Sequence, residues 1–205
     1  MKKLILVLAV TAGLVGSTAA TAAAPTVTLQ QDRSLIIFGG NVSLTGQVTP
    51  AAPNQQVTIT QTPMNRAARS TQVTTESDGT FSLDVSPRFN TRVEAKYGTA
   101  TSDELTIFVR PRLSLHKYAR HRFTAVVIAS RPFVGRYVWL TRWNASAHAW
   151  RNIKRLYLAH YVKSTGATTV SFRMRVRRGT KLRLFLNNTA ARPDYVRGWS
   201  NFVVS

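Results

Sequence analysis

The sequence predicts an all-β protein: two tandem antiparallel β-sandwiches that follow an N-terminal signal peptide. Three observations lead to this fold class. Nearly every segment after residue 24 alternates apolar and polar residues over a short run, as half-buried strands do. Gly, Pro, Asn and Asp bound these runs, and no later segment shows a helical period. The same order of runs then occurs twice along the chain.

The first predicted element is a signal peptide at residues 1–24. Two lysines give a positive start, an apolar run spans residues 4–15, and small residues follow up to Ala24. This is the pattern of a cleaved secretory signal, and its Ala-x-Ala sites place cleavage near residues 22–24. An uncleaved anchor is the alternative, but the run is shorter than the ~20 residues that cross a bilayer. We expect a protein that is secreted, extracellular or associated with the cell wall, with no transmembrane segment in the mature chain.

Residues 25–110 form the first predicted sandwich. Its turns are chemically distinct: Gly39-Gly40 supplies positive φ angles, and Asp78-Gly79 favours a type I′ hairpin turn. The runs between the turns predict strands at 26–30, 35–37, 41–48, 56–61, 70–75, 80–85, 92–97 and 104–109.

Residues 111–205 form the second predicted sandwich, because the runs of the first half recur there in order. Pro111 stiffens the short junction, so we expect the two domains in line with limited hinge freedom. The corresponding runs are 42–48 with 123–129, 56–60 with 137–141, 81–85 with 172–176, 92–97 with 181–186, and 104–109 with roughly 200–204.

Several motifs in these runs are shared with a known family. They are Gly39-Gly40-x-Val42-x-Leu44-x-Gly46-x-Val48, Asp78-Gly79-x-Phe81, Tyr97-Gly98 and Val109-x-Pro111, with Gly135-Arg136-Tyr137-Val138-Trp139-Leu140 and Trp150 in the second half. On these motifs the chain resembles the bacterial immunoglobulin-like (immunoglobulin or fibronectin III-like) domains of secreted, mostly actinobacterial proteins. The resemblance implies two tandem immunoglobulin-like sandwiches. It transfers no functional residue, since such domains serve as spacers, adhesins and ligand modules alike.

Charge divides the two halves. Residues 1–110 hold 9 Lys+Arg and 7 Asp+Glu, whereas residues 111–205 hold 19 Lys+Arg and a single acid, Asp194. The absence of cysteine excludes disulfides and thiolate metal sites. One carboxylate does not provide the acid pair of a glycosidase or a hard-cation site in this half. We therefore predict no enzyme activity, no cofactor and no metal.

The first candidate surface combines aromatic rings with cations. Alternation puts Val138 and Leu140 inside, with the leucines of the run 181–186. The outward positions, on strands expected to be neighbours, are Tyr137, Trp139, Lys181, Arg183 and Phe185. Such a face suits stacking of sugar rings or bases, with cations for phosphate, sulfate or carboxylate groups. Two alternatives stay open: Trp139 belongs to the core and the alternation is shifted by one, or the rings pack under a loop or a partner domain.

The second candidate surface is a basic stripe. The predicted strand 170–177 has an outward row at Arg173, Arg175 and Arg177. In this interpretation the preceding strand extends the stripe through Arg151, Lys154 and Arg155. Like charges side by side on a sheet repel, and a polyanionic partner relieves that cost. The alternative is unselective surface charge.

Together these features predict a secreted, non-enzymatic protein whose basic C-terminal domain adheres to polyanions. The expected partners are acidic cell-wall glycans, an anionic lipid surface or extracellular DNA. The near-neutral N-terminal domain serves as a spacer. The alternative is a structural or protein–protein interaction module of the cell envelope that docks an acidic partner.

Overall fold

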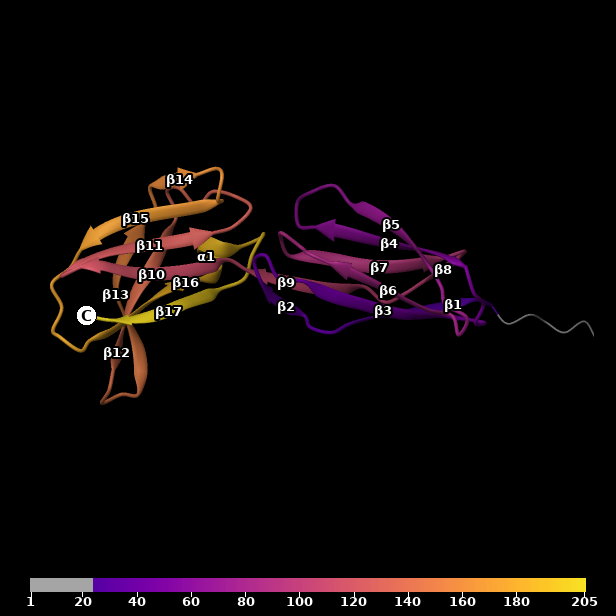
Figure 1. Cartoon of the computed structure of the whole chain (residues 1–205), viewed down its shortest axis with the longest axis horizontal. Helices are drawn as coiled ribbons and strands as arrows, with labels where there is room; N and C mark the ends of the chain where they lie inside the picture. The colour runs from indigo at the N-terminus through magenta and orange to yellow at the C-terminus, as the bar shows by residue number, and fades with distance from the viewer. Residues whose placement is uncertain (1–23) are drawn as a thin grey trace, which may run out of the picture.

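The computed structural model describes residues 24–205, which form an elongated, predominantly β chain with one short helix (Figure 1). The predicted signal peptide and its cleavage near residues 22–24 lie outside the described residues, apart from Ala24 itself. No helix among the described residues is long and apolar enough to cross a membrane.

The N-terminal half supplies two sheets. The first has the strand order β1-β3-β6, and the second has the order β2-β9-β7-β4-β5 with the short β8 beside β7. The pairs are antiparallel except for β2 and β9, which run parallel. The strands are β1 (Thr26–Gln31), β2 (Leu35–Ile37), β3 (Val42–Thr49), β4 (Gln56–Pro63), β5 (Arg69–Thr74), β6 (Thr80–Val85), β7 (Thr91–Tyr97), β8 (Ala100–Thr101) and β9 (Leu105–Arg110).

The C-terminal half supplies two more sheets, which are antiparallel throughout. Their strand orders are β10-β11-β15-β14 and β13-β12-β16-β17. The elements are β10 (Arg112–Ala119), β11 (Arg122–Ile128), β12 (Tyr137–Asn144), β13 (Ala149–Tyr157), β14 (His160–Val162), β15 (Ala167–Arg173), β16 (Lys181–Leu186), α1 (Asn188–Ala191) and β17 (Gly198–Val204).

Strand pairing in one half repeats in the other, in the order that the sequence runs predict. β3 pairs with β6 as β11 pairs with β15, and β4 pairs with β7 as β12 pairs with β16. β7 pairs with β9 as β16 pairs with β17. Pro111 is the one residue between β9 and β10, and the two halves lie end to end in Figure 1.

The core follows the predicted alternation. Val57 and Ile59 of β4 are fully buried, and so are their counterparts Val138 and Leu140 of β12. The three leucines of β16 are fully buried as well. The eight strands predicted for the first half are found with ends that differ by no more than two residues. Period-2 alternation was sufficient for most of these strands because one face of the strand meets the core.

Three expectations about local structure are wrong. The strand predicted over 170–177 ends at Arg173 because the segment beyond it joins no sheet. Asp78-Gly79 is not a type I′ hairpin turn: it connects β5 and β6, which lie in different sheets, and of the two residues Gly79 alone has a positive φ, +80°. The helix α1 was not expected; Asn187 caps it by accepting a hydrogen bond from the Ala190 amide.

The contact between the halves is built around Asp194, the single acid of the C-terminal half. Asp194 is 8% exposed, and its carboxylate pairs with Arg66 at 2.7 Å and with Arg131 at 2.6 Å. Arg66 comes from the loop after β4, so the ion pair joins the two halves directly. Arg66 also stacks on Phe89, with its guanidinium carbon 3.4 Å from the ring centroid.

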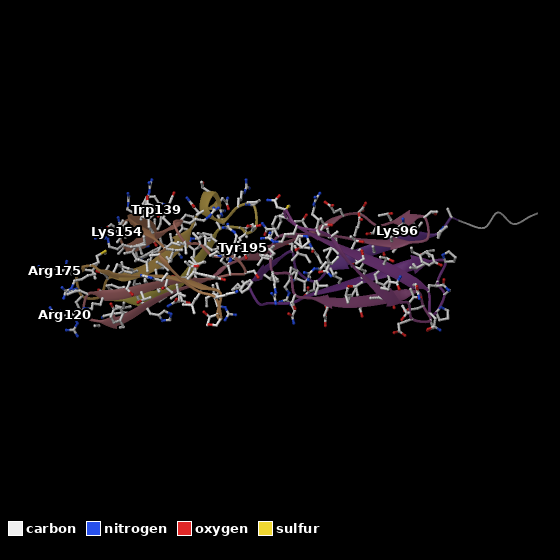
Figure 2. All side chains as sticks on the ribbon, turned by 90° about the horizontal axis from the view of Figure 1, so that it is seen from above. Lys96, Arg120, Trp139, Lys154, Arg175 and Tyr195 are labelled. Atoms are coloured by element: carbon white, nitrogen blue, oxygen red, sulfur yellow. The ribbon has the colours of Figure 1, made fainter. Side chains whose placement is uncertain are left out.

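Asn90 and Tyr195 complete this junction. The Asn90 amide N–H donates to the Asp194 carbonyl, and its side chain donates to the Pro193 carbonyl and accepts from the Val109 N–H. Tyr195 is fully buried, and Figure 2 places it between the halves. Its ring lies 5.6 Å from that of Phe89 and 5.8 Å from that of Phe133. The loop that carries Asp194 therefore fixes one half on the other.

Candidate functional site

The outer face of the sheet β13-β12-β16-β17 gathers aromatic residues and arginines. Cross-strand partners share a face, and Trp139 of β12 lies opposite Arg155 of β13 and Phe185 of β16. The other cross-strand pairs of this sheet place further aromatic rings and Arg183 on the same side. We call this surface the aromatic–arginine face; its members are Tyr137, Trp139, Trp143, Trp150, Arg155, Tyr157, Arg183, Phe185, Trp199 and Phe202.

Trp139 points away from the core, as the alternation predicts. Val138 and Leu140 on either side of it are fully buried against the core, whereas Trp139 is half-buried on the other face. The alternative that Trp139 is a core residue is therefore wrong. The predicted neighbours Tyr137, Arg183 and Phe185 do share its face, and Lys181 lies at the end of the same row.

The rings of this face pack on one another. Four pairs have centroids 5.6 to 5.8 Å apart: Tyr137–Trp139, Tyr137–Tyr157, Trp143–Trp150 and Phe185–Trp199. Trp143 and Trp150 are cross-strand partners near the end of the β12–β13 hairpin, beyond the pairing of β12 with β16. A two-stranded ribbon is only marginally stable, so this ring pair helps to hold it together.

Two arginines are stacked between these rings. The Arg155 guanidinium carbon lies 5.0 Å from the Tyr137 centroid and 4.9 Å from that of Trp139. The Arg183 guanidinium carbon lies 4.1 Å from the Trp150 centroid and 5.7 Å from that of Trp199. Stacking of this kind orients a guanidinium plane and leaves its N–H edge for other partners.

Arg183 is a cation without a counter-charge. It is half-buried, and its buried Nε has no hydrogen-bond partner within residues 24–205. No carboxylate of the described chain pairs with it. Burial lowers the pKa of the Arg183 guanidinium. An anion at the exposed part of this guanidinium would supply the missing counter-charge.

The second candidate surface is only partly assembled. Arg173, Arg175 and Arg177 are all exposed, and their neighbours Phe172, Met174 and Val176 pack against the core, so the outward row exists although the strand ends early. Register also places Arg122 of β11 directly opposite Arg173, which adds a repulsive pair. The row therefore has more cations than the sequence indicated.

The predicted extension of this row is wrong. Arg151, Lys154 and Arg155 lie on β13, which belongs to the other sheet, and β14 is the strand that pairs with β15. Arg151 pairs with Arg142 and Lys154 with Leu140, so both face away from the aromatic–arginine face. Arg155 alone of the three belongs to that face.

The end of the C-terminal half is cationic and hollow. Lys117, Arg120, His121 and Arg178 line a cavity of about 430 Å³, with Phe123 and Val176 also in its wall. Figure 2 shows Arg120 and Arg175 at the end of the molecule farthest from Lys96. The arginine row leads to this end, because Arg178 follows Arg177 in the chain.

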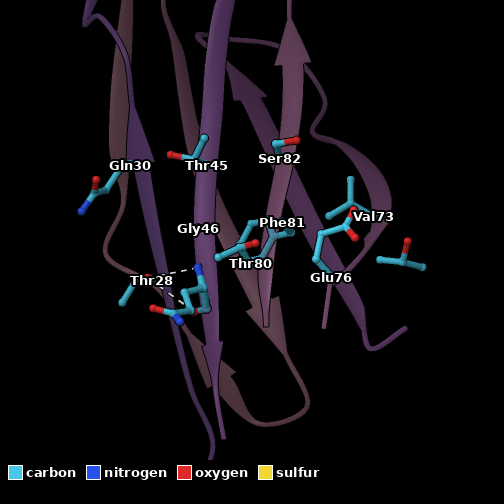
Figure 3. Close-up of a pocket in the computed structure, with 11 residues that line it drawn as sticks. Thr28, Gln30, Thr45, Gly46, Val73, Glu76, Thr80, Phe81 and Ser82 are labelled. Carbon is cyan, nitrogen blue, oxygen red and sulfur yellow. Dashed lines mark hydrogen bonds between the residues drawn. The ribbon is translucent and has the colours of Figure 1, made fainter. Parts of the chain in front are cut away.

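The N-terminal half offers a hollow of different character. Its lining, shown in Figure 3, is mostly hydroxyl and amide groups with Glu76 as its one carboxylate, and its volume is about 640 Å³. Gly46 lies in its wall beneath the Phe81 ring. Among the described residues, no three His, Cys, Asp or Glu side chains are placed to hold a metal ion.

Comparison with known proteins leaves the family open. No protein-family model matches this chain, and no curated protein matches its sequence. A tetra-tandem repeat from the extending region of a large adhesion protein aligns at TM-score 0.40 with 15% identity, over 89% of this chain and 49% of that one. This chain thus spans about half the length of that structure.

Two further solved structures align at similar levels. A marsupial T cell receptor aligns at TM-score 0.35 with 9% identity, over 88% of this chain and 100% of that chain. The native conformation of E. coli alpha-2-macroglobulin gives 0.36 with 16% identity, over 88% of this chain and 14% of that chain. At these scores the similarities assign neither a family nor a function.

Sequence reasoning missed part of this surface. Trp199, Phe202 and Trp150 belong to the aromatic–arginine face, but alternation did not indicate this. Trp199 and Phe202 are three residues apart and share a face only because the register of β16 with β17 shifts between Arg183 and Phe185. A similar shift between β12 and β13 separates Trp150 from Arg155, so these rings were not connected to Arg183. The pairing of Asp194 with Arg66 had no sequence signal, because 128 positions separate the two residues.

Proposed function

We propose that this chain is a secreted, non-enzymatic tandem of two immunoglobulin-like β-sandwiches, residues 25–110 and 111–205, whose basic C-terminal domain adheres to acidic polymers. One observation carries the proposal. The C-terminal half has 19 Lys+Arg and one acid, and that acid is buried at the junction in ion pairs with Arg66 and Arg131. Within residues 24–205, no other cation of this half has a carboxylate partner.

The mechanism is polyelectrolyte attraction. Eighteen cations without internal neutralisation attract condensed counter-ions or an anionic polymer, and release of counter-ions from the polymer favours binding. The exposed row Arg173, Arg175 and Arg177 brings three of these cations together, and Arg122 lies opposite Arg173. The N-terminal half, whose acids and bases nearly balance, acts as a spacer.

An experiment that removes positive charges from the full mature chain tests the proposal. Retention on a heparin column and affinity for duplex DNA are measured against salt for wild type, for Arg173→Gln/Arg175→Gln/Arg177→Gln and for a matched control, Arg69→Gln/Arg88→Gln/Lys96→Gln. All six side chains are exposed, and Arg66 is left out of the control because it pairs with Asp194. We expect the first variant to elute at lower salt and to reduce the slope of log K against log salt by roughly 2 to 3, with little change in the control.

Two results would contradict this function. Wild type eluting below about 150 mM salt would show that the charge gives no useful affinity at physiological ionic strength. Equal losses in the two triple variants would show that net charge alone matters. A stoichiometric partner protein that resists salt would instead favour a module that docks an acidic protein of the envelope.

A further inference from the structure

The aromatic–arginine face presents two guanidinium groups, Arg155 and Arg183, with which no carboxylate among residues 24–205 pairs. Trp150 and Trp199 hold the half-buried guanidinium of Arg183 in place. Arg155 is fixed in the same way over Tyr137 and Trp139. Because these guanidinium groups are already ordered, an anion that binds them loses little additional side-chain entropy.

The open rings beside the two arginines indicate the class of ligand. The guanidinium groups lie 4.1 to 5.0 Å from the centroids of Tyr137, Trp139 and Trp150, whereas Tyr157 and Phe202 are 57% and 54% exposed. Tyr157 follows Arg155 on the same side of β13, and Phe202 is the cross-strand partner of Arg183. Each arginine therefore has an open ring beside it, and this arrangement suits a sugar ring that carries a carboxylate.

We propose that the aromatic–arginine face binds an acidic polysaccharide, with sugar carboxylates on the N–H edges of Arg183 and Arg155 and sugar rings against the exposed aromatic rings beside them. This inference rests on the proposed function and specifies its ligand. Each carboxylate receives a forked pair of N–H bonds from one guanidinium, which a lysine at the same position does not provide. The arginine row at the other sheet adds long-range attraction without selecting the sugar.

The protein carries its own reporter for this site. All four tryptophans of the chain lie on the aromatic–arginine face, so intrinsic tryptophan emission reports this surface. The full mature chain is titrated with tetragalacturonate, with its neutral methyl ester, with inorganic polyphosphate and with a short single-stranded DNA. We expect a saturable emission change with tetragalacturonate, none with the methyl ester, and weaker effects with polyphosphate and DNA.

Arg183→Gln and Arg142→Gln form the matched pair of variants. Arg142 is exposed on the opposite side of the same strand pair, and its neighbour on β16 is Leu182. We expect Arg183→Gln to weaken tetragalacturonate binding about tenfold or more, the usual effect of losing a charged hydrogen bond, and Arg142→Gln to change it less than twofold. If Arg183→Gln does not fold by circular dichroism, Arg183→Lys keeps the charge without the fork and should still weaken binding several-fold.

The outcomes separate this inference from the proposed function. Equal binding by the Arg183 and Arg142 variants, or equal binding of the methyl ester and the acid, overturns the polysaccharide site. DNA that binds as tightly as the sugar, and loses as much affinity in Arg183→Gln, identifies a nucleic-acid surface instead. If the wild type is retained on heparin but shows no emission change with tetragalacturonate, this inference alone is contradicted. If the wild type is not retained on heparin, the proposed function is contradicted.

Discussion

We expect Asp194→Ala to lower the free energy of unfolding by about 3 kcal/mol. The Asp194 side chain is 11% exposed and pairs with Arg66 and Arg131, whose side chains are 36% and 16% exposed. Breaking a buried ion pair by removing one partner typically costs about 3 to 5 kcal/mol, and the partial exposure of Arg66 favours the lower end. Burial lowers the pKa of the Arg131 guanidinium and Asp194 opposes that effect, so the variant leaves a half-buried cation uncompensated.

Glu104→Ala is the control for this perturbation. Glu104 pairs with Arg92 at 3.6 Å, and both side chains are about half exposed, at 49% and 48%. Exposed pairs of this kind contribute about 0 to 1 kcal/mol, so we expect a change of less than 1 kcal/mol. The two variants each remove one carboxylate from an Arg pair and differ chiefly in burial.

Urea unfolding measures both variants. Circular dichroism follows the whole chain, and tryptophan emission follows the C-terminal half because all four tryptophans lie there. With a slope of about 1 to 3 kcal/mol per molar urea, a loss of 3 kcal/mol moves the midpoint by roughly 1 to 3 M. A midpoint for Asp194→Ala within error of that for Glu104→Ala would refute the assignment of Asp194 as the residue that stabilises the junction.

Two further predictions concern the core and alkaline pH. Gly46→Ala should destabilise by about 2 to 3 kcal/mol in the same urea assay, since a Cβ there overlaps the Phe81 ring and the Thr28 carbonyl oxygen; Gly98→Ala, which meets no atom within 4 Å but has φ +57°, should cost only about 1 kcal/mol. Burial raises the pKa of Tyr195 to about 12, so the folded state favours the neutral phenol, and stability should be fully present below pH ~10 and fall as pH rises from there towards 12. Tyr195→Phe removes this titration, and a stability profile between about pH 10 and 12 as steep as that of wild type would contradict the assignment.

Strand positions were predictable because alternation is a local signal. Most strands of the first half bury one side, so residues such as Val57 and Ile59 of β4 mark the inner face directly in the sequence. The same rule placed Trp139 outward correctly. The rule wrongly extended the strand to Arg177, because exposure alternates beyond Arg173 although no partner strand lies there. A sequence pattern reports which residues are exposed, and it does not report which strands pair.

Sheet membership was less predictable than strand position. The chain crosses between sheets after β13, and β14 returns to pair with β15, so neighbours in sequence are not neighbours in space. The basic stripe that joined Arg151 to Arg173 assumed the contrary. The register of β12 with β13 also shifts between Leu140 and Thr141, which no spacing rule indicated. Long-range pairing of this kind depends on loop paths and side-chain packing that composition does not encode.

The position of Asp194 links the architecture to the proposed adhesion. A carboxylate on either outer face would pair with neighbouring arginines and reduce the attraction for an anionic polymer. Instead the single acid of this half lies at the junction, where it neutralises Arg131 and joins Arg66 of the other half. Among residues 24–205, no carboxylate is then left to pair with Arg183 on the aromatic–arginine face. The residue that orients the two halves is thus also the one whose burial leaves the C-terminal surface free to bind an external anion.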